Sequence, residues 1–311
     1  MRLYLFFRLN KFVVYTVQTG GYDQINQPSV VDDRFDYVLF TDKIEQTRIG
    51  IWQVRSIPYV NDDKTRLSRY PKMHPKELLA DYVASLYVDA NVQITGQCIY
   101  DRCVELYEQS VDWAGNNHPY RDCIYDEAYF VYGLDTEENI FCWCHRLRKE
   151  GYPRHHGLFE NNVIFRVHNE RTKQVDAMWW QLYEQYTRRD QLTLFYVLWK
   201  YPKVKTGLLL PMDELNGDQK PFQVLKHTEV SRDSGRRGLN QTFWEHARCR
   251  CRYGIIEKEQ QFREFHYWLY GLNPFAAKVF LYLWGFYAIL VYGPIAKYRA
   301  SHRRKQCNSI G

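Results

Sequence analysis

The sequence predicts an α/β domain followed by a helical C-terminal region. Short apolar runs typical of β-strands, among them 11–16 (KFVVYT) and 36–40 (DYVLF), alternate with longer stretches of helical character. Such alternation is typical of a sheet flanked by helices. Aspartates follow two of the runs, at Asp42 and Asp89. Because ligands gather at the carboxyl ends of the strands in such sheets, these positions are the first candidates for a functional site.

Each predicted element follows from its local pattern. Strands are expected where short apolar runs stand between turn residues, and helices where apolar residues recur every three to four positions. The expected strands are 11–16, 36–40, 52–57, the run that ends at Asp89, the run that resumes at Val92, and 158–166. The expected helices are 67–81, 98–110, 121–132, 139–150, 175–186 and 189–199, with a polar connection at 113–119. Glycine, serine and charged residues become frequent at 215–238, which divides a domain at 1–230 from a helical region at 231–311.

The net charge of +6 is unevenly distributed. Five basic residues lie within the last fifteen positions, and the rest of the chain is close to neutral: Lys297, Arg299, Arg303, Arg304 and Lys305. A near-neutral main domain argues against a general nucleic-acid-binding protein. The eight cysteines show no four-ligand zinc spacing, which favours free thiols. The aromatic content of 17% suits stacking platforms for sugars or bases as well as core packing.

The segment 86–94 (LYVDANVQI) holds two oxygen-bearing side chains at a break between strands. An apolar run stops at Asp89, crosses Ala90 and Asn91, and resumes as alternating Val92 and Ile94. Mg²⁺ and Mn²⁺ prefer carboxylate and carbonyl oxygen, so Asp89 and Asn91 are candidate ligands of a cation that holds a nucleotide diphosphate. Asp and Asn are also common turn residues, and spacing alone does not separate the two interpretations.

Six segments together resemble a known family. They are VYTVQTGGYD (14–23), DYVLFTD (36–42), SRYPKMHPKELLADYVASLYVDANVQI (68–94), HPYRDCIYDEA (118–128), GLFENNVIFRVHN (157–169) and RDQLTLFYVLWK (189–200). In combination they are similar to the glycosyltransferase-like domain of bacterial polysaccharide gene clusters and plant mucilage-related proteins, which is distantly similar to glycosyltransferase family 8. The resemblance covers about residues 11–230. It implies a GT-A-like fold, a Rossmann-like mixed sheet flanked by helices.

The resemblance implies a metal site and a donor-sugar site. Asp89 and Asn91 stand where the GT-A fold places an Asp-x-Asp metal motif, and His227 stands where related enzymes place a C-terminal histidine ligand for Mn²⁺ or Mg²⁺. Asn91 departs from the motif, because an amide coordinates through oxygen without adding charge, which weakens metal affinity. Asp190 and Gln191 match an Asp-Gln pair that faces the anomeric carbon of the donor sugar in family 8. A helix N-cap explains Asp190-Gln191 equally well, and a surface loop explains His227.

Other residues are candidates for contact with the nucleotide. Thr16 and Gly20–Gly21 would let the backbone approach it closely, and Asp42 would accept hydrogen bonds from its base or ribose. Arg69 and Lys72 are the cationic candidates for the diphosphate, because cations stabilise a leaving group of growing negative charge. A solvated helix face is the alternative for these two cations.

A further group of polar residues suits the acceptor: His118, Glu160 and Asn161. A carboxylate near the acceptor hydroxyl acts as general base in an inverting enzyme, which makes Glu127 a catalytic candidate. Family 8 enzymes instead retain configuration and need no strong base. A salt-bridged helix residue is the alternative for Glu127.

The run 275–296 (FAAKVFLYLWGFYAILVYGPIA) is apolar except for Lys278 and precedes the basic tail. About 20 apolar residues span a bilayer, and Gly285 and Gly293-Pro294 interrupt this run, so a membrane-associated helix is favoured over a single span or a buried helix. Its Trp and Tyr suit the interface, and the tail suits anionic lipid. Residues 1–10 are too short for a signal segment. The expected location is therefore the cytoplasmic face of the cell membrane, with peripheral contact through 275–305.

Together these features predict a glycosyltransferase that moves a sugar from a nucleotide-diphosphate sugar to a glycan or lipid-linked acceptor in surface polysaccharide biosynthesis. A metal-dependent hydrolase is one alternative, because carboxylates and histidines around a metal activate water. No H-E-x-x-H or G-x-S-x-G motif supports it. A catalytically silent carbohydrate- or nucleotide-binding protein is the other, because Asn91 replaces the second acid of the metal motif.

Overall fold

The computed structural model describes residues 11–21, 24–131, 135, 137–211, 221–225 and 260–287. The chain forms two compact units, the first from 1–124 and 155–236 and the second from 125–154 and 237–311. The helical segment 125–154 thus groups with the C-terminal part of the chain. The domain boundary expected near residue 230 lies outside the described residues and stays a prediction.

The strands all belong to the first unit. They are β1 (Phe12–Gln18), β2 (Phe35–Thr41), β3 (Arg48–Ile49), β4 (Trp52–Ser56), β5 (Ala84–Val88), β6 (Val92–Ile94), β7 (Trp113–Asn117), β8 (Phe159–Val167), β9 (Thr206–Leu208) and β10 (Phe222–Val224). The helices of this unit are α2 (Lys64–Met73), α3 (Pro75–Leu78), α4 (Cys98–Glu108), α7 (Glu170–Tyr186) and α8 (Gln191–Lys200). The second unit contains α5 (Ile124–Phe130) except for its first residue, together with α6 (Glu137–Lys149), α12 (Gln260–Leu272) and α13 (Pro274–Tyr287).

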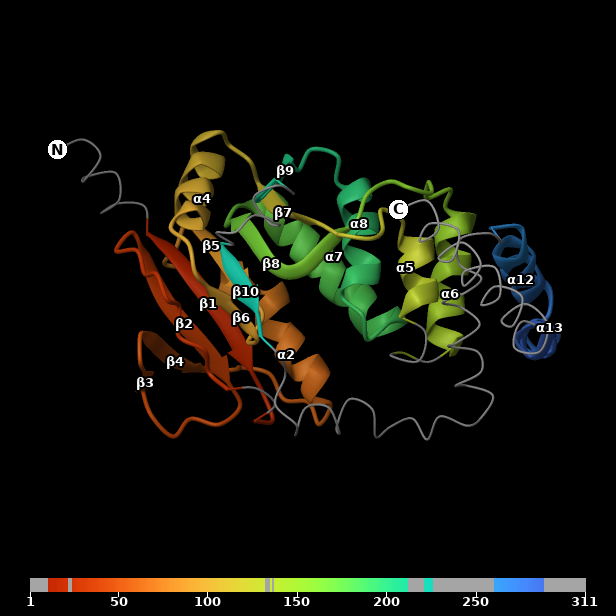
Figure 1. Cartoon of the computed structure of the whole chain (residues 1–311), viewed down its shortest axis with the longest axis horizontal. Helices are drawn as coiled ribbons and strands as arrows, with labels where there is room; N and C mark the ends of the chain where they lie inside the picture. Colours follow the sequence, from red (N-terminus) through yellow and green to blue (C-terminus); the bar gives the residue numbers. More distant parts are fainter. Residues whose placement is uncertain are drawn as a thin grey trace, which may run out of the picture. The chain divides into compact units, whose positions relative to one another are not determined.

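Eight strands form one mixed sheet in the order β3-β4-β2-β1-β5-β8-β7-β9. Its centre, β4-β2-β1-β5, is parallel, whereas β8 runs antiparallel to β5 and β7 antiparallel to β8. Figure 1 shows β1 and β2 side by side in this sheet. Central parallel strands are covered on both faces, which explains why six of the seven residues of β1 are buried. Because β1, β2 and β5 are parallel, their carboxyl ends share one edge.

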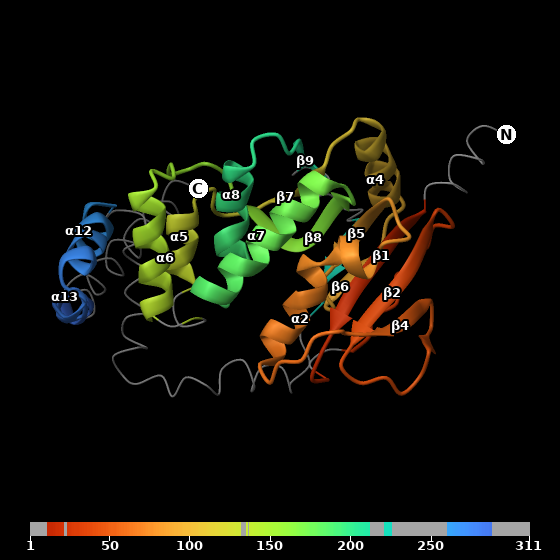
Figure 2. The same ribbon diagram turned by 180° about the vertical axis from the view of Figure 1, so that it is seen from behind.

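Helices cover both faces of the sheet. On one face Phe12, Val14 and Leu86 pack with Ile99 and Tyr100 of α4 in the main apolar cluster. On the other face the alternate residue Tyr15 reaches α2, where its hydroxyl donates to the Lys72 carbonyl. Figure 2 views this second face, with α2 and α7 in front of the strands. The predicted α/β class, a mixed sheet flanked by helices, is confirmed.

Two elements differ from the prediction. The expected polar connection at 113–119 contains strand β7, which pairs with β8 across an irregularity between Gly115 and Asn116. Trp113 and Asn116 are buried despite the polar sequence around them, because pairing on both sides of β7 satisfies its backbone. The expected helix at 67–81 is also divided at His74, where Pro75 cannot donate a backbone hydrogen bond and starts α3.

The second unit is helical in its described part. The expected apolar helix at 275–296 is present as α13 up to Tyr287, and residues 288–296 lie outside the described residues. Asn273 caps α13, because its side-chain oxygen accepts from the Ala276 backbone. None of the helices that the structure describes is both long and apolar enough to cross a membrane.

Candidate functional site

Asp89 lies directly after β5, at the carboxyl edge of the sheet. Its backbone is held on both sides: its N–H donates to the Asn162 carbonyl at 2.8 Å, and its carbonyl accepts from Val92 at 2.8 Å. The Tyr87 hydroxyl donates to Asp89 Oδ1 at 2.6 Å. Burial and the Asp89 carboxylate raise the pKa of Tyr87 far above its usual value, so the phenol keeps its proton for this bond.

Lys72 lies between two carboxylates that are far apart in sequence. Its Nζ is 2.6 Å from Asp190 Oδ2 and 3.6 Å from Asp89 Oδ1, and it also stands 4.7 Å from the centre of the Tyr87 ring. Only 1% of the Lys72 side chain is exposed. Arg69, one helical turn earlier on α2, approaches Asp190 Oδ1 at 3.5 Å. Two cations and two anions thus form one cluster at the carboxyl edge of the sheet.

Asp190 occupies the N-cap position of α8, yet its side chain makes no capping hydrogen bond. The carboxylate turns to Lys72 and Arg69 instead. Burial alone would raise the pKa of Asp190, but these two cations outweigh that effect and hold the pKa well below its usual value. The N-cap interpretation of Asp190 is therefore not supported, and the side chain is a fixed anion in the cluster.

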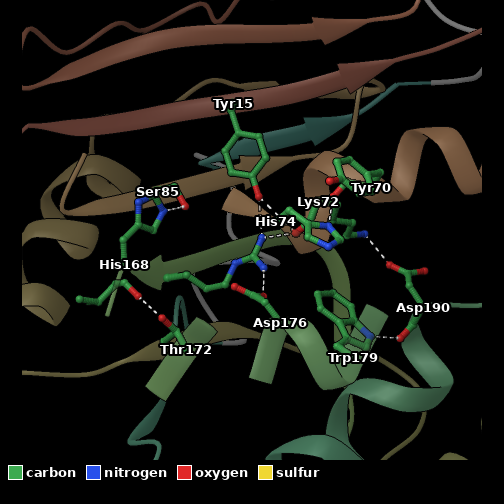
Figure 3. A network of polar contacts seen from close by, with 12 residues as sticks. Tyr15, Tyr70, Lys72, His74, Ser85, His168, Thr172, Asp176, Trp179 and Asp190 are labelled. Carbon is green, nitrogen blue, oxygen red and sulfur yellow. Dashed lines mark hydrogen bonds and ion pairs between the residues drawn. The ribbon is translucent and has the colours of Figure 1, made fainter. Parts of the chain in front are cut away.

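A buried network behind the cluster holds its backbone in place (Figure 3). The Arg166 guanidinium donates to the Lys72 carbonyl and the Tyr15 hydroxyl, and it pairs with Asp176 of α7. The indole of Trp179 donates to the Asp190 carbonyl at 2.9 Å. Strands β1 and β8 and helices α2 and α7 therefore fix the positions of Lys72 and Asp190 together.

Asn91 is held by a strand from much later in the chain. The side-chain Nδ2 of Asn91 donates to the backbone carbonyl of Leu225 at 3.2 Å, and the backbone carbonyl of Asn91 accepts from the Leu225 N–H at 2.7 Å. These bonds continue the antiparallel pairing of β6 with β10. Because Nδ2 is used, the side-chain oxygen of Asn91 remains for other contacts. His227 follows Leu225 by two residues in sequence and lies outside the described part of the chain.

The candidate nucleotide residues stand at the ends of β1 and β2. Gly20 and Gly21 both have positive φ values, of 65° and 66°, which glycine adopts readily. The Gly20 N–H donates to Asp42, and Lys64 pairs with Asp42 at 2.9 Å. Burial would raise the pKa of Asp42, but these two partners lower it. In this structure Asp42 stabilises the glycine turn.

Thr16 lies beside the metal-motif segment. It lines a small pocket together with Gln18, Asn26, Trp52 and Ala90. Its hydroxyl is buried and makes no hydrogen bond within the described residues. An unpartnered hydroxyl at this position is consistent with a ligand contact at the end of β1.

The remaining candidates fall in four places. Gln191 donates its side-chain amide to the Phe159 carbonyl at 2.9 Å, which ties α8 to β8. Asn161, on β8, is 6% exposed, and both polar atoms of its amide lack a hydrogen-bond partner among the described residues. Glu160 precedes it on the same strand. His118 accepts from the backbone of Tyr120 and Arg121 through Nδ1 and so forms a turn, and Glu127 is buried in α5 of the second unit.

The family of the chain follows from a comparison with known proteins. A family model described as "TOD1/MUCI70, glycosyltransferase-like domain" matches residues 7–215. The chain belongs to this family. The resemblance expected from the six sequence segments is thus confirmed. The TOD1/MUCI70 match covers every residue of the charged cluster and ends before β10.

Solved structures of glycosyltransferases resemble the TOD1/MUCI70 chain weakly. The apo structure of the bifunctional glycosyltransferase WbbM is 11% identical, with a TM-score of 0.42, and the match covers 81% of this chain and 52% of WbbM. Mouse xyloside xylosyltransferase 1, in its apo form, is 7% identical, with a TM-score of 0.37, over 64% of this chain and 84% of that one. The chain spans about half the length of WbbM. No curated protein matches the sequence.

The oxygen atoms at the candidate metal motif, Asp89 and Asn91, are of the kind that a hard divalent cation prefers. Tyr87 and Lys72 both face Oδ1 of Asp89, which leaves Oδ2 on a side chain that is 30% exposed. The Asn91 side-chain oxygen, which is not used in the bond from Nδ2 to Leu225, would supply a second, uncharged ligand. This donor set fits Mg²⁺ or Mn²⁺, with less charge than two carboxylates would supply.

Sequence reasoning did not single out Tyr87, Arg166 or Trp179. Tyr87 lies on β5 two residues before Asp89, which directly follows the strand, and side chains two apart in extended chain point to the same face, so this contact had a usable signal. Arg166 is a charged residue inside the strand-like run 158–166, which marks a buried partner. The Trp179 indole donates a hydrogen bond to the backbone carbonyl of Asp190, and no sequence pattern predicts such a contact.

Proposed function

We propose that this glycosyltransferase-family protein transfers a sugar from a nucleotide-diphosphate sugar to a glycan or lipid-linked acceptor, with the reaction centred between Asp89 and Asp190. One observation carries the proposal: the buried Lys72 ammonium joins the metal-motif carboxylate to the Asp190 carboxylate. Burying the Lys72 ammonium and the Asp190 carboxylate is costly unless each has a partner of opposite charge. Retaining this cluster at a ligand-binding edge of the sheet supports a catalytic role.

In this proposal Asp89 and Asn91, with His227 from the following segment, hold the divalent cation. A bound Mn²⁺ or Mg²⁺ supplies positive charge to the diphosphate leaving group. Asp190 remains ionised at neutral pH, because Lys72 and Arg69 depress its pKa. A fixed carboxylate at this place stabilises positive charge that develops at the anomeric carbon.

The nucleotide is proposed to bind at the ends of β1 and β2. Thr16 offers an unpartnered hydroxyl there, and Gly20–Gly21 offers backbone without side chains. Arg69 is the cation with the more exposed side chain, at 20% against 1% for Lys72. Arg69 is therefore the better placed of the two to meet a phosphate.

The acceptor side and the cellular role complete the proposal. Glu160 and the unpartnered Asn161 amide lie on β8, whose start bonds to Asp89 through Asn162. Hydroxyl groups of a sugar are suitable partners for such an amide. The acceptor would be part of a surface polysaccharide or its lipid-linked precursor, at the cytoplasmic face of the cell membrane.

A thermal-shift screen of nucleotide sugars, with and without Mn²⁺, tests the donor site. The wild type should be stabilised by one nucleotide sugar in a metal-dependent way, since a ligand that binds only the native state raises its stability. Asp89→Ala should abolish this shift. Asp81→Ala removes an exposed aspartate before β5 and should leave it unchanged. Folded wild type that responds to no nucleotide sugar would sink the proposal.

A second assay separates transfer from hydrolysis. Released nucleotide diphosphate is measured with and without an added glycan acceptor. A transferase should release it faster when the acceptor is present, whereas a metal-dependent hydrolase should act on its substrate with no nucleotide sugar at all.

A further inference from the structure

Helices α12 and α13 expose two rows of large apolar side chains. Phe265, Trp268 and Leu272 follow one another at three- and four-residue intervals on α12, and Phe275, Val279 and Leu283 do so on α13. All six are between 41% and 75% exposed. Residues spaced in this way share one face of a helix. The exposed area is on the order of 600 Å², at the upper end of the apolar patches seen on soluble monomers.

The two helices form one packed element, which supports both rows. The rings of Phe265 and Phe280 meet edge to face at 5.0 Å, and Ala277 is fully buried. The rows approach each other at the turn, where Leu272 and Phe275 flank Asn273 and Pro274. Exposure of the six side chains is therefore a property of a folded helix pair.

The charge of this region has one sign. From Phe265 to Gly311 the sequence contains no aspartate or glutamate and six lysines and arginines. Of the 42 lysines and arginines, 36 therefore lie before Phe265, and these equal the 36 acidic residues of the chain. The whole formal charge of +6 thus belongs to the last 47 residues.

We propose that the apolar face of α12 and α13 inserts into the interface of an anionic lipid bilayer, to which the positive charge of the C-terminal sequence attracts the protein. Aromatic and aliphatic side chains on one face, combined with lysine and arginine and no acid, are the features of helices that lie in a membrane interface. The positive charge is attracted to the negative surface potential of an anionic bilayer, and a zwitterionic bilayer offers no such attraction. This inference concerns location and stands apart from the proposed sugar transfer.

Sedimentation of the full chain with lipid vesicles tests the inference. Phosphatidylcholine vesicles are compared with vesicles that also contain phosphatidylglycerol. The wild type should bind the anionic vesicles at least tenfold more tightly. Salt near 1 M should release a large part of it, because the Debye length is then only about 3 Å.

Two sets of variants divide the apolar contribution from the charged one. Trp268→Gln, Phe275→Gln and Leu283→Gln together remove exposed side chains that the fold does not bury, and should lower binding at least tenfold. Arg299→Gln, Arg303→Gln, Arg304→Gln and Lys305→Gln together should lower binding to anionic vesicles by up to about fivefold for each charge removed. Ile44→Gln with Val60→Gln removes exposed apolar residues of the first unit and should not change it.

Three outcomes overturn the inference. The wild type could remain in the supernatant with both kinds of vesicle. The apolar triple variant, with an unchanged circular dichroism spectrum, could bind as tightly as the wild type. Analytical ultracentrifugation could show that the wild type self-associates without lipid and that the triple variant does not, which would assign the face to a second copy of the chain.

Discussion

Lys72 illustrates how a single buried charge can organise a site. The ammonium is fully enclosed, and its nearest partner is Asp190 rather than the metal-motif residue Asp89. A lysine in this position orients the Asp190 carboxylate while contributing to the potential felt by a ligand at Asp89. We therefore regard Lys72 as a positioning residue for Asp190.

Lys72→Met should separate these roles kinetically. Loss of the ammonium leaves Asp190 with Arg69 alone, and we expect kcat to fall on the order of 10²-fold with little change in the KM for the donor. Lys72→Arg keeps the charge and should recover part of the loss. Steady-state kinetics on both variants measure this, with Lys76→Met, which removes the partner of Glu170, as the matched control.

The opposite pattern would assign Lys72 to the diphosphate. If KM for the donor rises strongly while kcat is unchanged, the side chain binds ground state and transition state alike. The charged cluster would then serve donor binding and not the orientation of Asp190.

Asn91→Asp should strengthen the binding of free Mn²⁺. A second carboxylate at the motif adds charge to the ligand set, and we expect an increase in affinity on the order of tenfold or more. Electron paramagnetic resonance of Mn²⁺ without nucleotide measures this directly. Asn91→Ala should weaken binding, and equal affinities for all three proteins would remove Asn91 from the metal site.

The individual site residues differ in how far sequence could locate them. Sequence located Asp89 by its position at the end of a strand and Asp190 by the family resemblance. The structure brings both carboxylates to Lys72. Their roles in catalysis stay predictions. The partners of Arg166 and Trp179 could not be predicted from the sequence, because they depend on how α2, α7 and β8 pack.

At the scale of elements, the carboxyl end of β8 is joined to the entry of β5 by His168. Its Nδ1 lies 2.9 Å from the Tyr82 carbonyl, which can only accept, and its Nε2 lies 2.8 Å from the Ser85 hydroxyl. Burial, assisted by the nearby Arg166, lowers the pKa of His168 from its ordinary value near 6.5 to about 4. The imidazole is therefore neutral in the folded protein at physiological pH.

This pKa predicts a loss of stability in mild acid. Between pH 6.5 and 4 the unfolded chain binds a proton at His168 that the native chain does not, so the free energy of unfolding falls as the pH falls, by ~3 kcal/mol in total. Below pH 4 both states are protonated and this contribution stops changing. Urea unfolding at several pH values should show a shallower pH dependence in His168→Gln than in the wild type. His145→Gln, at an exposed position of the second unit, should follow the wild type.

Elements with a strong apolar pattern were predicted well, and short or polar elements were not. β1, β2 and β5 have continuous apolar runs because both of their faces are covered. β7 (WAGNN) lacks such a run, and its strand character comes from pairing with β8 and β9. Three-residue strands such as β10 depend wholly on their partner and leave no periodicity to detect.

At the scale of the whole first unit, Arg166 and Asp176 form a buried ion pair that links the sheet to α7. Neither side chain is more than 6% exposed. The guanidinium also stacks 4.7 Å from the Trp113 ring, so removing it disturbs β1, β7, β8 and α2 together.

Arg166→Met should therefore destabilise the unit severely. The variant leaves the Asp176 carboxylate buried without its partner, and we expect the free energy of unfolding to fall by about 3–5 kcal/mol. Arg166→Met with Asp176→Leu removes both charges and should recover much of this loss. Urea unfolding followed by tryptophan fluorescence measures both variants. Lys173→Met breaks an exposed pair with Glu77 and should cost no more than about 1 kcal/mol. A double variant no more stable than Arg166→Met would show that the hydrogen bonds of Arg166, and not its charge pairing, dominate.

The bonds between Leu225 and Asn91 also determine where the domain can be cut. The family match ends at residue 215, but β10 begins at Phe222 and supplies the strand partner of β6. A fragment that stops at 215 would leave β6 as an open strand edge, which is a known site of aggregation, and would release the Asn91 side chain. The smallest soluble piece of this protein should therefore include residues 221–225, and expression trials with ends on either side of that segment should differ sharply in yield.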